Sequence, residues 1–157
     1  MSQRSLKALL VEDDENKRDQ IASFVQSQYP NLELQIASSL IGGLRAAKAA
    51  KPELILLDMT LPNFDAEVGD TGTGMHAFGG EEFLRQIERF QLKSKVILIT
   101  QFETFGEHPH MKGLAEVDND LKARFPDMYL GAIYYHATIN EWMKQLGVVV
   151  DKILEEQ

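Results

Sequence analysis

Three short apolar runs, each followed directly by polar residues, constrain the fold of this chain more than any other feature of its sequence. The runs occupy residues 7–11, 54–57 and 96–99. The polar residues that follow them are Glu12-Asp13-Asp14, Asp58 and Thr100. Runs of leucine and β-branched residues that are apolar on both faces are typical of central strands in a parallel sheet. Two weaker strand patterns cover residues 32–37 and 129–135.

Amphipathic stretches with apolar residues at helical spacing separate these runs. We expect five helices, which contain residues 21–29, 40–47, 83–90, 114–121 and 139–154. Asp14 is placed to cap the first helix, and Ser38 or Ser39 the second, by accepting a hydrogen bond from a backbone N–H. Strands and helices that alternate in this way predict an α/β domain. Its expected form is a doubly wound, five-stranded parallel sheet of flavodoxin-like (βα)5 topology and strand order 2-1-3-4-5.

Length and composition limit the classes of protein. The 157 residues predict a single domain over 1–157, with loop insertions near 62–80 and 101–113. No run approaches the roughly 18 consecutive apolar residues of a membrane span, and the polar start is unlike a signal peptide. Disulfide and thiolate chemistry are excluded because the chain has no cysteine. A net charge of −8 without a Lys/Arg cluster argues against direct binding to nucleic acid.

The polar residues after the three main runs predict a site at one edge of the sheet. In the expected strand order, Glu12, Asp58 and Thr100 converge at the carboxyl edge, where ligands bind in such sheets. Clustered carboxylates repel one another, and a bound hard cation such as Mg²⁺ is the usual resolution. Beside that cation Asp58 could act as a nucleophile towards phosphorus. The Thr100 hydroxyl could then hydrogen-bond an oxygen of the incoming group.

Three segments of the chain resemble the signature segments of response regulator receiver domains. They are LLVEDDE at 9–15, LILLDMTLP at 54–62 and VILIT at 96–100. The resemblance extends from about residue 6 to about residue 155, interrupted by the two insertions. Asp58 followed by Met-Thr-Leu-Pro is its most specific part, whereas the acidic cluster alone is a weak signal. The chain therefore resembles a stand-alone, atypical receiver domain.

The resemblance implies a role for each matching residue. Glu12 and Asp13 match the acidic pair that holds Mg²⁺. Asp58 matches the aspartate that is phosphorylated, which is also a metal ligand. Thr60 matches the position whose backbone carbonyl ligates the metal, and Thr100 matches the hydroxyl switch residue.

The resemblance also implies a function in two-component phosphorelay signalling. A receiver is a regulatory phosphoacceptor rather than an enzyme, with Mg²⁺ as its cofactor and the cytoplasm as its expected location. The expected partners are a histidine kinase or phosphotransfer protein and an unknown downstream protein. A homodimer is a further option. The apolar stripe from Ile139 to Leu154 is expected to be core, with a dimer face as the alternative.

One charge that the resemblance predicts is absent from the fifth strand. Receiver domains usually have a lysine before a proline at its end, whereas this chain has Ile-Tyr-Tyr-His-Ala at 133–137. The lysine position falls on Tyr135 or His136, and neither carries a permanent charge. Loss of the ammonium would weaken phosphoryl binding and the switch that follows. It favours an alternative, a pseudo-receiver that binds partners without being regulated by phosphorylation.

Other kinds of chemistry have less support. A phosphohydrolase of the haloacid dehalogenase type would need a second acid two residues after Asp58, where Thr60 stands. A flavodoxin-like cofactor binder would need a phosphate loop after the first strand, and none is present. His108 and His110 support zinc only weakly, because no third paired ligand accompanies them.

The first insertion leaves two interpretations open. It is rich in glycine and contains the acids Asp65, Glu67 and Asp70. A flexible surface loop is the plain interpretation. A lid or partner-contact surface is the alternative, suggested by its position beside the expected site and by Phe64 and Phe78.

Overall fold

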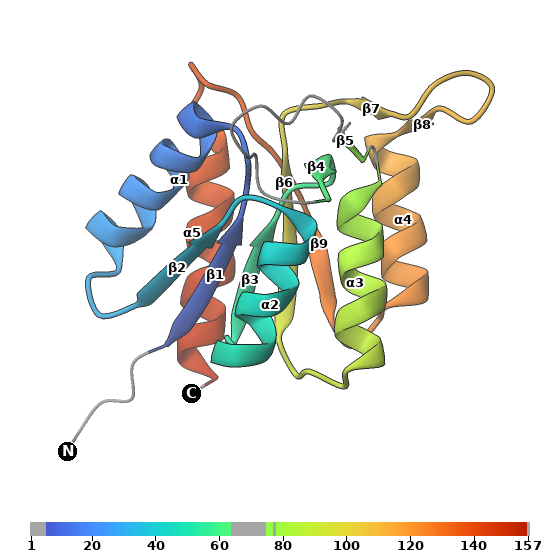
Figure 1. Cartoon of the computed structure of the whole chain (residues 1–157). Helices are drawn as coiled ribbons and strands as arrows, with labels where there is room; N and C mark the ends of the chain where they lie inside the picture. The colour runs from blue at the N-terminus through green and yellow to red at the C-terminus, as the bar shows by residue number, and fades with distance from the viewer. Residues whose placement is uncertain (1–5, 64–74, 77, 157) are drawn as a thin grey trace, which may run out of the picture.

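The computed structural model describes residues 6–63, 75, 76 and 78–156. Its central sheet contains five parallel strands: β1 (Lys7–Val11), β2 (Glu33–Ala37), β3 (Leu54–Leu57), β6 (Lys95–Thr100) and β9 (Tyr129–Tyr134). They lie in the order β2-β1-β3-β6-β9 (Figure 1). Counted along the chain, this is the predicted order 2-1-3-4-5, so the expected doubly wound α/β fold is confirmed.

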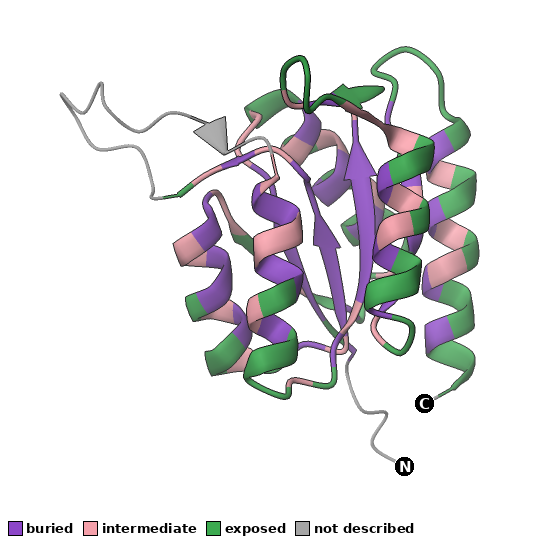
Figure 2. Ribbon diagram, turned by 90° about the vertical axis from the view of Figure 1, so that its right-hand side faces the viewer, coloured by how far each residue is buried: buried purple, intermediate pink, exposed green. Residues whose placement is uncertain are grey.

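Helices cover both faces of the sheet. They are α1 (Glu15–Gln28), α2 (Leu40–Ala50), α3 (Gly79–Arg89), α4 (Leu114–Arg124) and α5 (Glu141–Glu155). Helices α1 and α5 pack on one face, and α2, α3 and α4 pack on the other (Figure 1). In Figure 2 the buried residues of the helices lie on the sides of the ribbons that face the sheet, and the exposed residues lie on the outer sides. Among the helices that the structure describes, none is long and apolar enough to cross a membrane.

The strands are apolar on both faces because both faces are covered. All four residues of β3 are buried. Ile55 and Leu57 pack in the core formed with α2, α3 and α4, and the other two pack in the core formed with α1 and α5. In the register of the sheet Leu57 lies beside Val11 of β1 and Leu98 of β6. Glu12 and Asp58 directly follow Val11 and Leu57, so they leave the sheet level with each other at the same edge, where β6 ends at Thr100.

Two helix caps agree with the sequence prediction. The Asp14 carboxylate caps α1 by accepting a hydrogen bond of 2.8 Å from the Lys17 backbone N–H. Ser39 caps α2, and its Oγ accepts a hydrogen bond of 3.0 Å from the Gly42 N–H. Of the two serines that the sequence offers, Ser39 is therefore the cap of the second helix.

Replacing Ser39 with alanine is expected to lower the free energy of unfolding by about 1 kcal/mol, because the Gly42 N–H loses its acceptor. Ser39 is fully buried, so water does not easily take over that role. Ser38→Ala is the matched control and should leave stability nearly unchanged. Urea denaturation followed by circular dichroism measures both variants, and equal losses would contradict the cap assignment.

The last helix buries fewer residues than the apolar stripe in the sequence predicts. Helix α5 buries Trp142, Leu146, Val150 and Ile153. Ile139 lies before the helix and is 55% exposed, and Leu154 is 39% exposed. Met143 and Val149 are partly buried and also pack against the core. The interpretation of the whole stripe as core is therefore wrong only at its two ends.

Two short hairpins lie outside the sequence prediction. Strand β4 (Leu61–Pro62) pairs with β5 (Met75–His76), and β7 (Thr104–Phe105) pairs with β8 (Lys112–Gly113). The second hairpin falls within the expected insertion near 101–113, and the first begins one residue before the expected insertion near 62–80. Gly79 and Gly80, which the sequence pattern assigns to the first insertion, instead open α3. The Gly80 N–H donates a 2.8 Å hydrogen bond to the Met59 carbonyl, which ties the start of α3 to the exit of β3.

The segment before α3 packs against the β7–β8 hairpin. The rings of Phe78 and Phe105 have centres 6.5 Å apart. Gly106 has a φ of 81°, and a Cβ at this position would lie 3.0 Å from the Phe78 ring. Phe78 therefore helps to anchor the second insertion. The other residues behind the lid interpretation lie outside the described part of the chain: Phe64, Asp65, Glu67 and Asp70. That interpretation stays a prediction.

Candidate functional site

Three carboxylates meet at the carboxyl edge of the sheet. Glu12 and Asp13 follow β1, and Asp58 follows β3. Each offers an oxygen that lies within 4.8 Å of the others. Glu12 is only 1% exposed and Asp58 only 4% exposed, whereas Asp13 is half-buried. The Asp58 N–H is held by the Val11 carbonyl at 3.1 Å, so the strand register itself places the carboxylates together.

Burial raises the pKa of all three carboxyl groups. It raises the pKa of Glu12 to about 7, although the Lys17 ammonium opposes the shift and the Asp58 charge adds to it. Burial also raises the pKa of Asp58, again against the influence of Lys17. Burial and the charge of Glu12 raise the pKa of Asp13. The site is therefore short of positive charge as it stands.

A buried lysine completes the site, and the sequence analysis does not foresee it. The Lys17 side chain is fully buried. Its Nζ lies 2.5 Å from Glu12 Oε1 and 3.3 Å from Asp58 Oδ1. The same ammonium donates a 2.7 Å hydrogen bond to the Ile99 carbonyl of β6. Lys17 thus reaches from α1 across the ends of three strands.

One sequence signal could have revealed this lysine. Ile21 and Val25 lie four and eight residues after Lys17, and both are buried in α1. At that spacing the three side chains share one face of the helix. Lysine is almost never fully buried unless it is paired, so a lysine in line with an apolar stripe indicates an acidic partner in the core.

The threonines named from the sequence lie at the same edge. Thr100 ends β6 and is fully buried, and its Oγ1 accepts a 3.1 Å hydrogen bond from the Phe102 N–H. That bond leaves the hydroxyl proton available for donation. Thr60 lies two residues after Asp58, between β3 and β4. Their contacts with a phosphoryl group or a metal remain predictions.

The two candidates for the missing lysine occupy different environments. Tyr135 is buried, its ring centre is 6.0 Å from Lys17 Nζ, and its hydroxyl donates a 2.7 Å hydrogen bond to Gln20 Oε1. His136 is exposed, and its Nδ1 lies 3.1 Å from the Thr138 hydroxyl. Tyr135 is therefore the residue that faces the site. The positive charge absent from this strand is present nearby on Lys17.

The described residues are suitable for a hard divalent cation. Asp58 Oδ1 is buried and accepts no hydrogen bond from the described residues, so its lone pairs are available. The donor atoms of Glu12, Asp13 and Asp58 are all carboxylate oxygens, which Mg²⁺ prefers. A cation would also relieve the repulsion that contributes to the raised pKa values.

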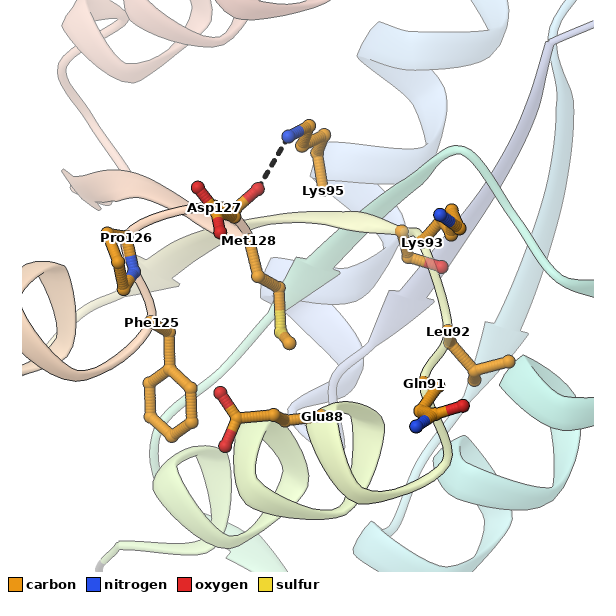
Figure 3. Close-up of a pocket in the computed structure, with 10 residues that line it drawn as sticks. Glu88, Gln91, Leu92, Lys93, Lys95, Phe125, Pro126, Asp127 and Met128 are labelled. Atoms are coloured by element: carbon orange, nitrogen blue, oxygen red, sulfur yellow. Dashed lines mark hydrogen bonds between the residues drawn. The ribbon is translucent and has the colours of Figure 1, made fainter.

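A hollow at the opposite end of the sheet has no comparable chemistry. It lies where β6 and β9 begin, between the ends of α3 and α4 (Figure 3). Glu88, Lys93 and Lys95 are among the residues that line it. Lys95 Nζ donates a 2.5 Å hydrogen bond to the Asp127 carbonyl, drawn as a dashed line in Figure 3. The candidate functional site is therefore the carboxylate cluster at the carboxyl edge.

The fold is that of response regulator receiver domains. The receiver domain of a putative LuxO repressor protein from Vibrio parahaemolyticus superposes with a TM-score of 0.66 at 18% identity, covering 98% of this chain and 92% of that one. A CheY-like receiver domain from Methanospirillum hungatei JF-1 gives a TM-score of 0.62 at 18% identity, covering 98% and 100%. The resemblance inferred from the sequence segments is thereby confirmed.

Sequence relatives place the chain more closely. It is 37% identical over 138 residues to the uncharacterized protein y4jR of Sinorhizobium fredii, covering 87% of this chain and 91% of that protein, and it belongs to the same family. It is 25% identical over 152 residues to the Detocs response regulatory protein DtcB of Enterobacter cloacae, covering 96% and 99%. No family model matches the chain.

Proposed function

We propose that this protein is a phosphoacceptor in two-component signalling and that Asp58 receives the phosphoryl group. The observation that carries this proposal is the convergence of Glu12, Asp13 and Asp58 within 4.8 Å at the carboxyl edge of a receiver fold. A cluster of buried carboxylates costs stability, and groups with such perturbed pKa values are typical of functional sites. Similarity to a response regulatory protein supports the same conclusion.

The proposed reaction is a phosphoryl transfer from a histidine. An Asp58 carboxylate oxygen attacks phosphorus, the P–N bond of the phosphohistidine breaks, and the imidazole nitrogen keeps the electron pair. The product is an aspartyl phosphate. Mg²⁺, when bound by Glu12, Asp13, Asp58 and the Thr60 carbonyl, would neutralise charge on the transferred group. The Thr100 hydroxyl would donate a hydrogen bond to a phosphoryl oxygen.

The proposal extends to partners and location. A histidine kinase or phosphotransfer protein would supply the phosphoryl group in the cytoplasm, and another protein would receive the signal. Tyr134 and Leu130, on the last strand, are 39% and 41% exposed, which leaves apolar surface for contact with a partner protein.

The assignment of residues 1–157 as one domain stays a prediction.

Incubation with Mg²⁺ and acetyl phosphate tests the proposal directly. We expect intact mass to rise by one phosphoryl group, in an adduct that survives acid and is released by base. Asp58→Asn should form no adduct, while Asp127→Asn, the same exchange at an exposed position at the opposite end of the sheet, should leave adduct formation unchanged. Phosphorylation that persists in Asp58→Asn would place the acceptor elsewhere.

The Lys17 ion pairs give the pseudo-receiver alternative a specific basis. An ammonium 3.3 Å from Asp58 already neutralises part of its charge without any metal. A protein of that kind would bind its partner without Mg²⁺ and would form no adduct in the same experiment. The two functions therefore predict different results in this experiment: a phosphoryl adduct for the phosphoacceptor and none for the pseudo-receiver.

A further inference from the structure

The Lys17 ammonium has a donor that its close contacts do not use. A lysine carries three N–H donors. Glu12 Oε1 at 2.5 Å and the Ile99 carbonyl at 2.7 Å occupy two of them. Asp58 Oδ1 lies farther away, at 3.3 Å, and accepts no hydrogen bond from the described residues. The third donor is thus next to Asp58 but only loosely engaged.

The carboxylates divide between the ammonium and a cation. Lys17 pairs with Glu12 and Asp58, whereas it has the weakest of the influences on Asp13. Asp13 is also the most accessible of the three. One ammonium and one Mg²⁺ together balance three carboxylates. The lysine and the metal can therefore occupy the site at the same time.

We propose that Lys17 Nζ donates a hydrogen bond to an oxygen of the phosphoryl group on Asp58. The inference rests on the proposed function, since it requires Asp58 to be the acceptor. Helix α1 would then provide the fixed positive charge that receiver domains usually carry as a lysine on the fifth strand, where this chain has Tyr135. No proton moves in this contact: Nζ stays an ammonium and exchanges Asp58 Oδ1 for a phosphoryl oxygen.

The same contact connects the site to a spectroscopic probe. Lys17 Nζ lies over the Tyr135 ring, and that ring is 5.2 Å from the ring of Trp142, the sole tryptophan of the chain. Movement of the ammonium towards a phosphoryl group changes the charge beside this pair of rings. Trp142 fluorescence should therefore report occupancy at Asp58.

A titration with beryllofluoride, a phosphoryl mimic, in the presence of Mg²⁺ tests the inference. We expect Lys17→Gln to bind beryllofluoride roughly 10- to 100-fold more weakly than the wild type, the loss of one charge-assisted hydrogen bond. The affinity of Lys17→Gln for Mg²⁺, measured without beryllofluoride, should not fall below that of the wild type. Arg18→Gln removes the same charge one residue away and should match the wild type. Thermal unfolding establishes that each variant is folded.

Selective ¹⁵N labelling of lysine side chains gives a second readout, and its decisive comparison is made within the wild type. The Nζ signal of Lys17 in the wild type should shift when beryllofluoride is added with Mg²⁺, and should not shift in Asp58→Asn. An unchanged signal in a wild type that binds beryllofluoride would overturn the inference.

The remaining outcomes are distinguishable. Folded Lys17→Gln that binds beryllofluoride as tightly as the wild type overturns the inference and leaves the proposed function intact. The inference is also overturned if Lys17→Gln binds Mg²⁺ much more tightly than the wild type and binds beryllofluoride equally well. That result would mean that the Lys17 ammonium fills the cation position in the metal-free protein and makes no contact with the phosphoryl group. A wild type that binds no beryllofluoride overturns the proposed function, and the inference with it.

Discussion

Replacing Lys17 with methionine is expected to lower the free energy of unfolding by about 3–5 kcal/mol at pH 8, the usual cost of removing one partner from a buried ion pair. Methionine has a similar length, so packing changes little. The loss arises because Glu12 and Asp58 must then either stay charged in a buried place without the ammonium or take up protons. The loss should be smaller at pH 5, where Glu12 takes up a proton instead. Urea denaturation of metal-free protein at both pH values measures the difference.

Two further variants separate the lost ion pair from a general effect of charge. Lys144→Met removes the same charge from an exposed position on α5 and should cost less than about 0.5 kcal/mol. Adding Glu12→Gln to Lys17→Met should restore part of the lost stability, because one buried charge disappears. A loss below about 1 kcal/mol in Lys17→Met would show that the pairs contribute little.

The sequence predicts the sheet well because each of its strands, and each helix, has a pattern of apolar residues that is visible within its own segment. The run 54–57 before Asp58 is apolar throughout, a pattern typical of a central strand that is covered on both faces. Strand order then brings Glu12, Asp13 and Asp58 together without any further information. Likewise Asp14 caps α1 through a contact three residues along the chain, which sequence spacing can reveal.

The features that the sequence does not predict depend on long-range contacts. Lys17 meets the Ile99 carbonyl 82 residues away, and a search for a positive charge on the fifth strand passes over a lysine on the first helix. The two short hairpins pair residues across insertions whose ends have no strand-like period. Ile139 continues a helical pattern in the sequence, yet it lies before α5 and is exposed. Local patterns show periodicity, but they do not show how much of a stripe is covered.

Metal-free protein is expected to lose stability as the pH rises from about 5 to about 8, because burial raises the pKa of Glu12 from 4.5 to about 7. Between those pKa values the folded state holds this proton more often than the unfolded chain does. Rising pH therefore favours the unfolded chain, by up to roughly 3 kcal/mol for the full shift. Asp58 contributes in the same direction. Urea denaturation in EDTA at several pH values measures the trend, and Glu12→Gln should flatten it; parallel profiles would contradict the assignment.

Mg²⁺ binding should show the opposite dependence on pH, because the same proton competes with the cation. Affinity for Mg²⁺ is expected to rise roughly tenfold between pH 6 and pH 8, as Glu12 loses its proton. Trp142 fluorescence can follow the titration, and proton release on binding can be measured in a weakly buffered solution. Glu12→Gln should bind Mg²⁺ with little dependence on pH over this range. Magnesium would then stabilise the protein most at the pH where the metal-free site is weakest, so stability measured with and without Mg²⁺ should diverge as the pH rises. Curves that stay a constant distance apart would show that the proton on Glu12 and the cation do not compete.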